Sequence, residues 1–323
     1  MGRRRVDEIF VENGDIRLRV EVAGDGPVLL FVHGWPELPY SWRHQTAFFA
    51  ERGYRVAAME VRGYGQSSAP SDPARYNLAE LSDDVASVAA SLDTEPVVLI
   101  GHDWGGPIVW TTSIRHPDRV RAVAGLSVTY TPPTGSDLLS LLDRFYDGRF
   151  FYMLHFQEPG IIEAEFATDM RSSLKRVFHA GSGAAPVNSF LPDSQRDSKF
   201  LSLLPEPPDG PLEFLTDDDL DVYASAFTQT GLTGAFNRYR AMRYDAAALK
   251  DAEGQKVRHP ACFIAGERDM VRAIVPGFDA YAAAGAGCTD FRGTTIIEGA
   301  GHWVQQEAPE EVNAALGAFF DGL

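Results

Sequence analysis

The chain has 323 residues, of which 45% are hydrophobic and 23% charged, and 29 Lys and Arg against 45 Asp and Glu give a formal net charge of −16. This length is enough for two domains, or for one domain with a large insertion. The negative charge argues against a surface that binds nucleic acid or anionic lipid. Two cysteines, Cys262 and Cys288, are too few for a disulfide framework or a structural zinc site. We therefore expect a reduced, cytoplasmic protein.

The first five residues, MGRRR, are basic like the start of a targeting signal. Residues 6–10, VDEIF, carry charges where a secretory signal needs an apolar stretch. Val6 stands where myristoylation requires Ser or Thr. Elsewhere no apolar run approaches the ~18 residues of a membrane span. The sequence thus predicts neither export nor membrane anchoring.

Apolar runs alternate with amphipathic segments over the first 130 residues. Short strands are predicted within residues 8–32, ending in the apolar run PVLLFV at 27–32. Further strands are expected at 54–60, 96–100 and 120–127, and helices at 78–92 and 104–116. Continuous apolar strands that alternate with helices are typical of a parallel, doubly wound sheet.

The alternation stops after residue 132, and residues 133–246 contain helical stretches without a convincing strand. One helix is predicted to begin after Thr216 and to carry Leu220, Tyr223 and Phe227 on one face. Another would present Phe236 and Tyr239 together, and a long loop is expected at 181–215. Such a long irregular stretch is more often functional or mobile than a passive connection.

Strand character returns at 261–265 and 294–297, and a helix is expected from about Pro309 to the end. The sheet is therefore interrupted by a helical insertion after its sixth strand. The predicted organisation is an α/β core made of residues 1–132 and 247–323, with a helical lid at 133–246. We expect the lid to cover a site at the ends of the strands.

The motif GHDWGG at residues 101–106 lies between a predicted buried strand and a predicted helix. Small residues at 101 and 105 allow the sharp turn of the G-x-S-x-G nucleophile elbow, in which Asp103 takes the place of serine. The alternative is an aspartate that only caps the helix. Carboxylates are ionised near neutral pH, so Asp103 needs no base to attack saturated carbon. Water must then cleave the resulting ester, and that step needs a base.

The base is predicted to be His302, in the motif GAGHW at 299–303 after the last predicted strand. Two carboxylates in GERD at 266–269, Glu267 and Asp269, could orient it, and we favour Asp269. The chain order of nucleophile, acid and histidine is that of α/β-hydrolases. His302 could also be a structural histidine, but three correctly ordered residues at strand ends rarely occur by accident.

The motif HGWP at residues 33–36 follows the strand at 27–32. Here the backbone N–H of Trp35 could join that of Trp104 in an oxyanion hole for the Asp103 ester. The alternative is a tight turn with an X-Pro bond, and both interpretations are compatible.

Five segments together resemble the soluble epoxide hydrolases of the α/β-hydrolase fold, over nearly the whole chain. They are HGWP at 33–36, RGYGQSSAP at 62–70, GHDWGG at 101–106, GERD at 266–269 and GHW at 301–303. The resemblance implies a mostly parallel central sheet flanked by helices, and a cis Trp35–Pro36 bond. It implies a cofactor-free hydrolase that adds water to an epoxide and releases a vicinal diol.

The resemblance also assigns two proton donors, which the alkoxide left by epoxide opening requires. FYMLHFQEPG at 151–160 resembles the family's first lid-tyrosine segment and implies Tyr152, while FNRYR at 236–240 resembles the second and implies Tyr239. Tyrosine is protonated at neutral pH and can donate to the ring oxygen. His155 departs from the pattern, because an aromatic residue such as Tyr is expected there. Either tyrosine alone could serve only packing.

Haloalkane dehalogenases share the core motifs and the Asp nucleophile, and they form the second hypothesis. The indole of Trp104 could assist a departing halide, but many dehalogenases have Asn where this chain has Trp35. A third hypothesis is a non-catalytic ligand receptor on this scaffold. We favour an epoxide hydrolase whose substrates are a small apolar epoxide and water. Its pocket is predicted to be lined by Trp35, Trp104, Met153, Phe236 and Trp303.

Overall fold

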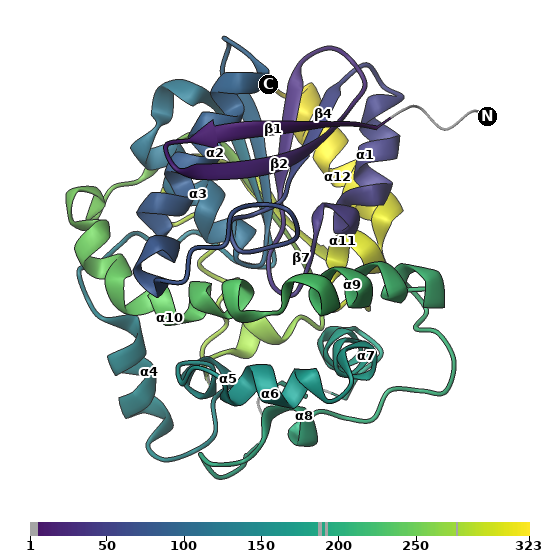
Figure 1. Cartoon of the computed structure of the whole chain (residues 1–323). Coiled ribbons are helices and arrows are strands. Elements are labelled where there is room, and N and C mark those ends of the chain that lie inside the picture. The colour runs from purple at the N-terminus through teal and green to yellow at the C-terminus, as the bar shows by residue number, and fades with distance from the viewer. Residues whose placement is uncertain (1–5, 187–188, 191–192, 276) are drawn as a thin grey trace.

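The computed structural model describes residues 6–186, 189–190, 193–275 and 277–323. Within these residues one eight-stranded sheet has the order β1-β2-β4-β3-β5-β6-β7-β8 (Figure 1). Strands β4, β3, β5, β6, β7 and β8 pair in parallel, whereas β1 and β2 add antiparallel pairings at one edge. The strands are β1 Asp7–Asn13, β2 Ile16–Ala23, β3 Val28–Val32, β4 Arg55–Met59, β5 Val97–His102, β6 Val120–Leu126, β7 Val257–Gly266 and β8 Cys288–Ile297. This confirms the predicted mostly parallel sheet.

The central strands are buried on both faces, which explains why they are continuous apolar runs rather than alternating ones. In β3, Leu30 and Val32 enter the hydrophobic core on one face of the sheet, while Leu29 and Phe31 enter the core on the other. Helices α2 and α3 cover the first face, and α1 and α12 the second (Figure 1). These flanking helices, with the short α11, are α1 Arg43–Ala50, α2 Leu78–Leu92, α3 Gly105–Arg115, α11 Val304–Glu307 and α12 Pro309–Asp321.

Helices α4 to α10 lie between β6 and β7 in the chain and gather below the sheet in Figure 1. We call this inserted segment the cap. Its helices are α4 Leu138–Tyr146, α5 Tyr152–His155, α6 Ile161–Ala167, α7 Met170–Gly181, α8 Phe200–Leu203, α9 Asp217–Thr230 and α10 Thr233–Ala248. Among the described residues of the cap no strand of the main sheet occurs, as predicted.

Two details of the cap differ from the sequence prediction. The loop expected at 181–215 contains the short helix α8, and four of its residues (187–188 and 191–192) lie outside the described residues. Helix α10 continues to Ala248, two residues beyond the predicted end of the lid. The start of α9 agrees with prediction, since the Thr216 side chain accepts a hydrogen bond from the Asp219 N–H.

The fold brings four loops to one edge of the sheet, because parallel strands end on the same side. These loops follow β3, β5, β7 and β8, and they carry Trp35, Asp103, Asp269 and His302. None of the described helices is both long enough and apolar enough for a membrane span.

Candidate active site

Asp103 occupies the turn between β5 and α3, where its backbone has a φ of 50°. Such a conformation is uncommon for a residue with a Cβ and is typical of a nucleophile elbow. The approach of neighbouring loops requires glycine: a Cβ on Gly34 would lie 2.4 Å from the Asp103 Cβ, and one on Gly105 would lie 2.0 Å from the Val32 carbonyl oxygen. The turn therefore presents the Asp103 carboxylate at the edge of the sheet.

The Asp103 carboxylate contacts both predicted partners. The backbone N–H of Trp35 donates to Asp103 Oδ1 at 2.7 Å, and the Trp35–Pro36 bond is cis, as predicted. His302 Nε2 lies 3.4 Å from Asp103 Oδ2. An N–H that already points at one carboxylate oxygen is placed to stabilise negative charge on that oxygen.

His302 is bound on its other side by Asp269. The His302 Nδ1 atom lies 3.0 Å from Asp269 Oδ1, which also accepts a hydrogen bond from the Val271 N–H at 2.9 Å. Glu267 is exposed, and it accepts from the Gly299 N–H instead. Of the two carboxylates left open by the sequence, Asp269 is the one that contacts the histidine.

The charges of this buried group depend on one another. Burial alone would lower the pKa of His302, but the carboxylates of Asp269 and Asp103 raise it well above its usual value. Burial alone would raise the pKa of Asp269, but the charge of His302 lowers it. With Asp103 unmodified, His302 is therefore held as an imidazolium between two carboxylates.

Tyr152 begins α5 and Tyr239 lies within α10, so both come from the cap. Their ring centroids are 6.2 Å apart and both side chains are buried. Burial raises the pKa of each hydroxyl well above 10, and the negative charge of Asp103 raises both further. Both tyrosines are thus protonated hydroxyls within the electrostatic influence of Asp103, as a proton donor must be.

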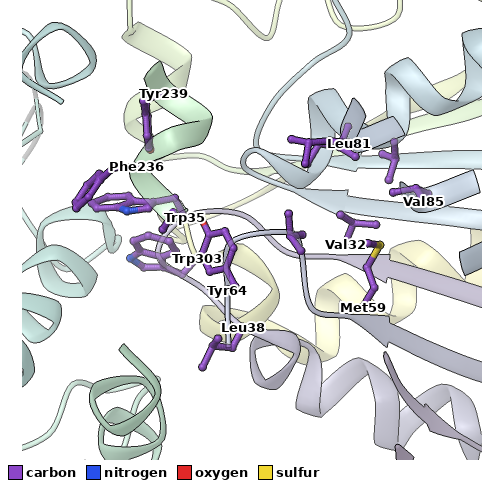
Figure 2. Close-up of a cluster of buried hydrophobic side chains, with 14 of the residues drawn as sticks. Val32, Trp35, Leu38, Met59, Tyr64, Leu81, Val85, Phe236, Tyr239 and Trp303 are labelled. Atoms are coloured by element: carbon purple, nitrogen blue, oxygen red, sulfur yellow. The ribbon is translucent and has the colours of Figure 1, made fainter. Parts of the chain in front are cut away.

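Aromatic rings of the cap surround the predicted pocket residues of the core. Figure 2 shows Phe236 and Tyr239 of α10 close to Trp35, and their ring centroids lie 5.7 and 5.8 Å from that of Trp35. Trp104 lies 5.3 Å from Tyr239, centroid to centroid, and the Arg238 guanidinium is 4.5 Å from the centroid of the indole. Donation by the Trp104 backbone N–H to an oxyanion stays a prediction.

Trp104 and Met153 also line a mostly apolar cavity of about 350 Å³ between α3, α4 and α10. Trp303 is placed differently. Its ring packs against His302 at 4.8 Å, and its indole N–H donates to the Phe178 carbonyl at 2.7 Å. The side chain of Trp303 therefore supports the histidine, and contact with substrate stays a prediction for it and for the fully buried Phe236.

Sequence reasoning missed a buried pair beneath the site. Glu37 Oε2 lies 2.6 Å from His102 Nδ1, and His102 Nε2 donates to the His302 carbonyl at 2.8 Å. Burial alone would raise the pKa of Glu37, but His102 lowers it. Both residues stand within or beside motifs already singled out, and their position next to predicted strand ends was the available signal.

Comparison with known proteins identifies the family to which the chain belongs. The alpha/beta hydrolase fold family matches residues 27–309. The chain is 38% identical to epoxide hydrolase A of Mycobacterium tuberculosis over 98% of both chains, and 33% identical to epoxide hydrolase 2 of Siraitia grosvenorii over 97% of both. A solved epoxide hydrolase from an endophytic Streptomyces superposes with a TM-score of 0.92 at 36% identity, covering 98% of this chain and 96% of the other. The chain therefore belongs to the epoxide hydrolases of the α/β-hydrolase fold and is an enzyme of that class.

Proposed function

We propose that this enzyme converts a small apolar epoxide to a vicinal diol in two steps, through a covalent alkyl ester of Asp103. One observation carries the proposal: Asp103 is contacted by a base and an N–H donor from the core, while two buried tyrosines of the cap experience its charge. We keep the division expected from the sequence, with the cap at residues 133–246 and the remainder as the core, except that α10 carries the cap on to Ala248.

In the first step a carboxylate oxygen of Asp103 attacks one epoxide carbon. The bond between that carbon and the ring oxygen breaks, and the electron pair goes to the oxygen. Tyr152 or Tyr239 gives its hydroxyl proton to this oxygen, which becomes the first hydroxyl of the product. No base is needed, because the nucleophile is already a carboxylate.

The ester formed at Asp103 carries no charge, and this changes His302. One of the two carboxylates that raise the pKa of His302 is then neutral, so the imidazolium can release its proton and become a base. The tyrosine that gave its proton to the substrate in the first step can accept the proton that His302 releases.

In the second step neutral His302 takes a proton from water, and the hydroxide attacks the ester carbonyl carbon. Trp35 and Trp104 backbone N–H groups stabilise the oxyanion. Collapse of this intermediate breaks the bond between the carbonyl carbon and the ester oxygen that leads to the substrate. Asp103 is freed and the diol is released. The imidazolium of His302, still paired with Asp269, supplies the proton that the leaving alkoxide requires. The carboxylic acid formed at Asp103 then gives its proton to the neutral His302, which restores the starting carboxylate and imidazolium.

The test is a panel of styrene-type, aliphatic and fatty-acid epoxides assayed for diol, followed by the His302→Gln variant. With the best substrate, His302→Gln should form the Asp103 ester but fail to hydrolyse it, so that intact-mass spectrometry shows an added substrate mass on a peptide containing Asp103. The double variant His302→Gln/Asp103→Asn is the control and should carry no adduct. A His302→Gln enzyme without adduct that still turns over at the normal rate would exclude His302 from the mechanism.

A further inference from the structure

The loop that carries His302 is joined by hydrogen bonds to the end of cap helix α7. The backbone N–H of His302 donates to the Gly181 carbonyl at 2.7 Å, and the Trp303 indole donates to the Phe178 carbonyl at 2.7 Å. The two backbones lie so close that a Cβ on Gly301 would be 2.3 Å from the Gly183 nitrogen. The loop that carries His302 therefore packs directly against the cap.

One carboxylate joins these two segments. Glu307, at the end of α11, accepts hydrogen bonds from the N–H groups of Gly301 and Trp303, both at 3.0 Å. These two residues stand on either side of His302. The same carboxylate accepts a third hydrogen bond, at 2.7 Å, from the N–H of Gly183 in the cap. Glu307 thus fixes the residues before and after the base and ties them to the cap.

We propose that Glu307 is a positioning residue for His302, and that its three hydrogen bonds hold the base in the arrangement needed to hydrolyse the covalent intermediate. This inference rests on the proposed function, in which His302 acts as a base only in the second step. Glu307 itself acts through the loop, since its carboxylate is occupied by three backbone N–H donors. The first step requires Asp103 and the tyrosines, so it depends less on this loop.

The charge state of Glu307 is relevant at mildly acidic pH. Burial raises its pKa to about 6, the three N–H donors oppose that rise, and the charge of Asp269 adds to it. A protonated carboxyl is a weaker acceptor, so the three bonds should weaken as the pH falls through this value. Besides Glu307, the charged or titratable groups that line the neighbouring groove are Arg43 and His44 of α1, His179 of α7, Glu213 before α9, Asp219 of α9, Glu298 after β8, and Glu310 and Glu311 of α12.

The decisive variant is Glu307→Gln, because one of its two terminal atoms becomes an NH₂ group that cannot accept the N–H it faces. We expect hydrolysis of the alkyl-enzyme to slow by up to about a hundredfold, which is the factor that the free energy of one hydrogen bond to a charged group corresponds to. Alkylation should stay within about twofold, so the adduct should accumulate during turnover. Single-turnover mass spectrometry gives both rates. Glu310→Gln removes the same charge from the same groove without a bond to the loop, and it should behave as wild type.

Equal effects on both steps, or no effect on hydrolysis, would overturn the positioning role. A wild-type enzyme that forms neither diol nor adduct would instead overturn the proposed function. A second measurement needs no variant: hydrogen–deuterium exchange of the wild type at pH 8 and pH 5, corrected for intrinsic exchange. Peptides covering Gly183 and Gly301–Trp303 should lose protection together at pH 5, while β5 keeps it. Unchanged protection in both peptides would contradict the inference even if Glu307→Gln does not fold.

Discussion

At Asp103, two residues of the loop after β3 decide where the carboxylate lies. Gly34 leaves the space that the Asp103 side chain occupies, and the Trp35 N–H binds its Oδ1 atom. The motifs HGWP and GHDWGG are therefore two halves of one contact, although 68 positions separate Trp35 from Asp103.

The two cap tyrosines provide a test at the residue scale. Replacing Tyr152 or Tyr239 by Phe should slow alkylation, because the alkoxide loses one of its proton donors. General-acid assistance is typically worth ~10²–10⁴-fold, so the double variant should be nearly inactive on epoxides. Each single variant should keep part of the activity if the hydroxyls share the alkoxide. Stopped-flow or single-turnover measurement of ester formation gives the rates.

Phenylalanine preserves most of the packing of both rings, so thermal unfolding of the variants serves as the control. A folded double variant that opens epoxides at the wild-type rate would remove both tyrosines from the proposed mechanism.

The predicted grouping of Asp103, His302 and Asp269 is found in the structure, since each residue follows an apolar strand within a recognisable motif. The sequence did not predict Glu37 or Glu307. Their partners are His102, in one case, and backbone N–H groups of Gly183, Gly301 and Trp303 in the other. A backbone donor carries no residue identity, so the contacts of Glu307 leave no pattern in a single sequence, whereas Glu37 and His102 stand beside and within motifs that the sequence shows.

At the scale of elements, the same reasoning explains which strands and helices were predicted well. Strands β3, β5 and β6 are apolar because both their faces are buried, and their positions agree with prediction. Strand β8 is at the edge of the sheet and mostly exposed, so only residues 294–297 of its ten were recognised. Helix α8 has four residues, too few for a helical period to be detected.

Helix α10 is a different case, because the side chains in its first half are buried on every face of the helix. The polar side chains of Asn237, Arg238 and Arg240 are about as buried as the rings of Phe236 and Tyr239. The cations are paired, Arg238 with Asp245 and Arg240 with Glu163. Periodicity predicts that Phe236 and Tyr239 share a face, but it places arginines in water. The pairing that keeps these arginines inside is a tertiary property.

Phe236 tests how far the aromatic cluster of α10 stabilises the protein. Its ring is fully buried and packs against Trp35, Phe156 and Phe166. Phe236→Ala should lower the free energy of unfolding by about 3–5 kcal/mol, because it removes apolar contacts and leaves a cavity. Tyr244→Ala on the same helix is the matched control, since that ring is 39% exposed and should cost far less.

Urea denaturation of the two variants and the wild type gives the comparison. Similar losses for Phe236→Ala and Tyr244→Ala would show that the cluster contributes no special stability.

At the scale of the whole molecule, one buried histidine should make the free energy of unfolding depend on pH in the acidic range. His33 is buried, and its Nε2 atom accepts a hydrogen bond from the Val61 N–H at 3.1 Å, so the ring is neutral. Burial lowers the pKa of His33 to about 4. In the unfolded chain a histidine has a pKa of about 6.5. Between these values the unfolded chain binds a proton that the folded protein does not.

The free energy of unfolding should therefore fall as the pH drops from about 6.5 to 4, and His33 alone should account for about 3 kcal/mol of the loss. The His33→Gln variant keeps a side-chain oxygen that can accept the hydrogen bond from the Val61 N–H. Glutamine does not take up a proton in this pH range. Urea denaturation at pH 7, 6, 5 and 4 should show a smaller decline for His33→Gln than for wild type. Parallel curves would mean that His33 is not the group responsible.

The insertion between β6 and β7 has a consequence for how enzymes of this kind diversify. Every residue proposed to make or cleave the ester belongs to the scaffold, whereas both proposed proton donors belong to the inserted segment. An ancestral gene could thus exchange the insertion as a module and change which leaving groups the enzyme accepts, without altering its nucleophile. A module without tyrosines would still serve substrates whose leaving group departs as a stable anion. Chimeras that combine this scaffold with the corresponding segment of an Asp-dependent dehalogenase would show whether the two halves of the chemistry are inherited separately.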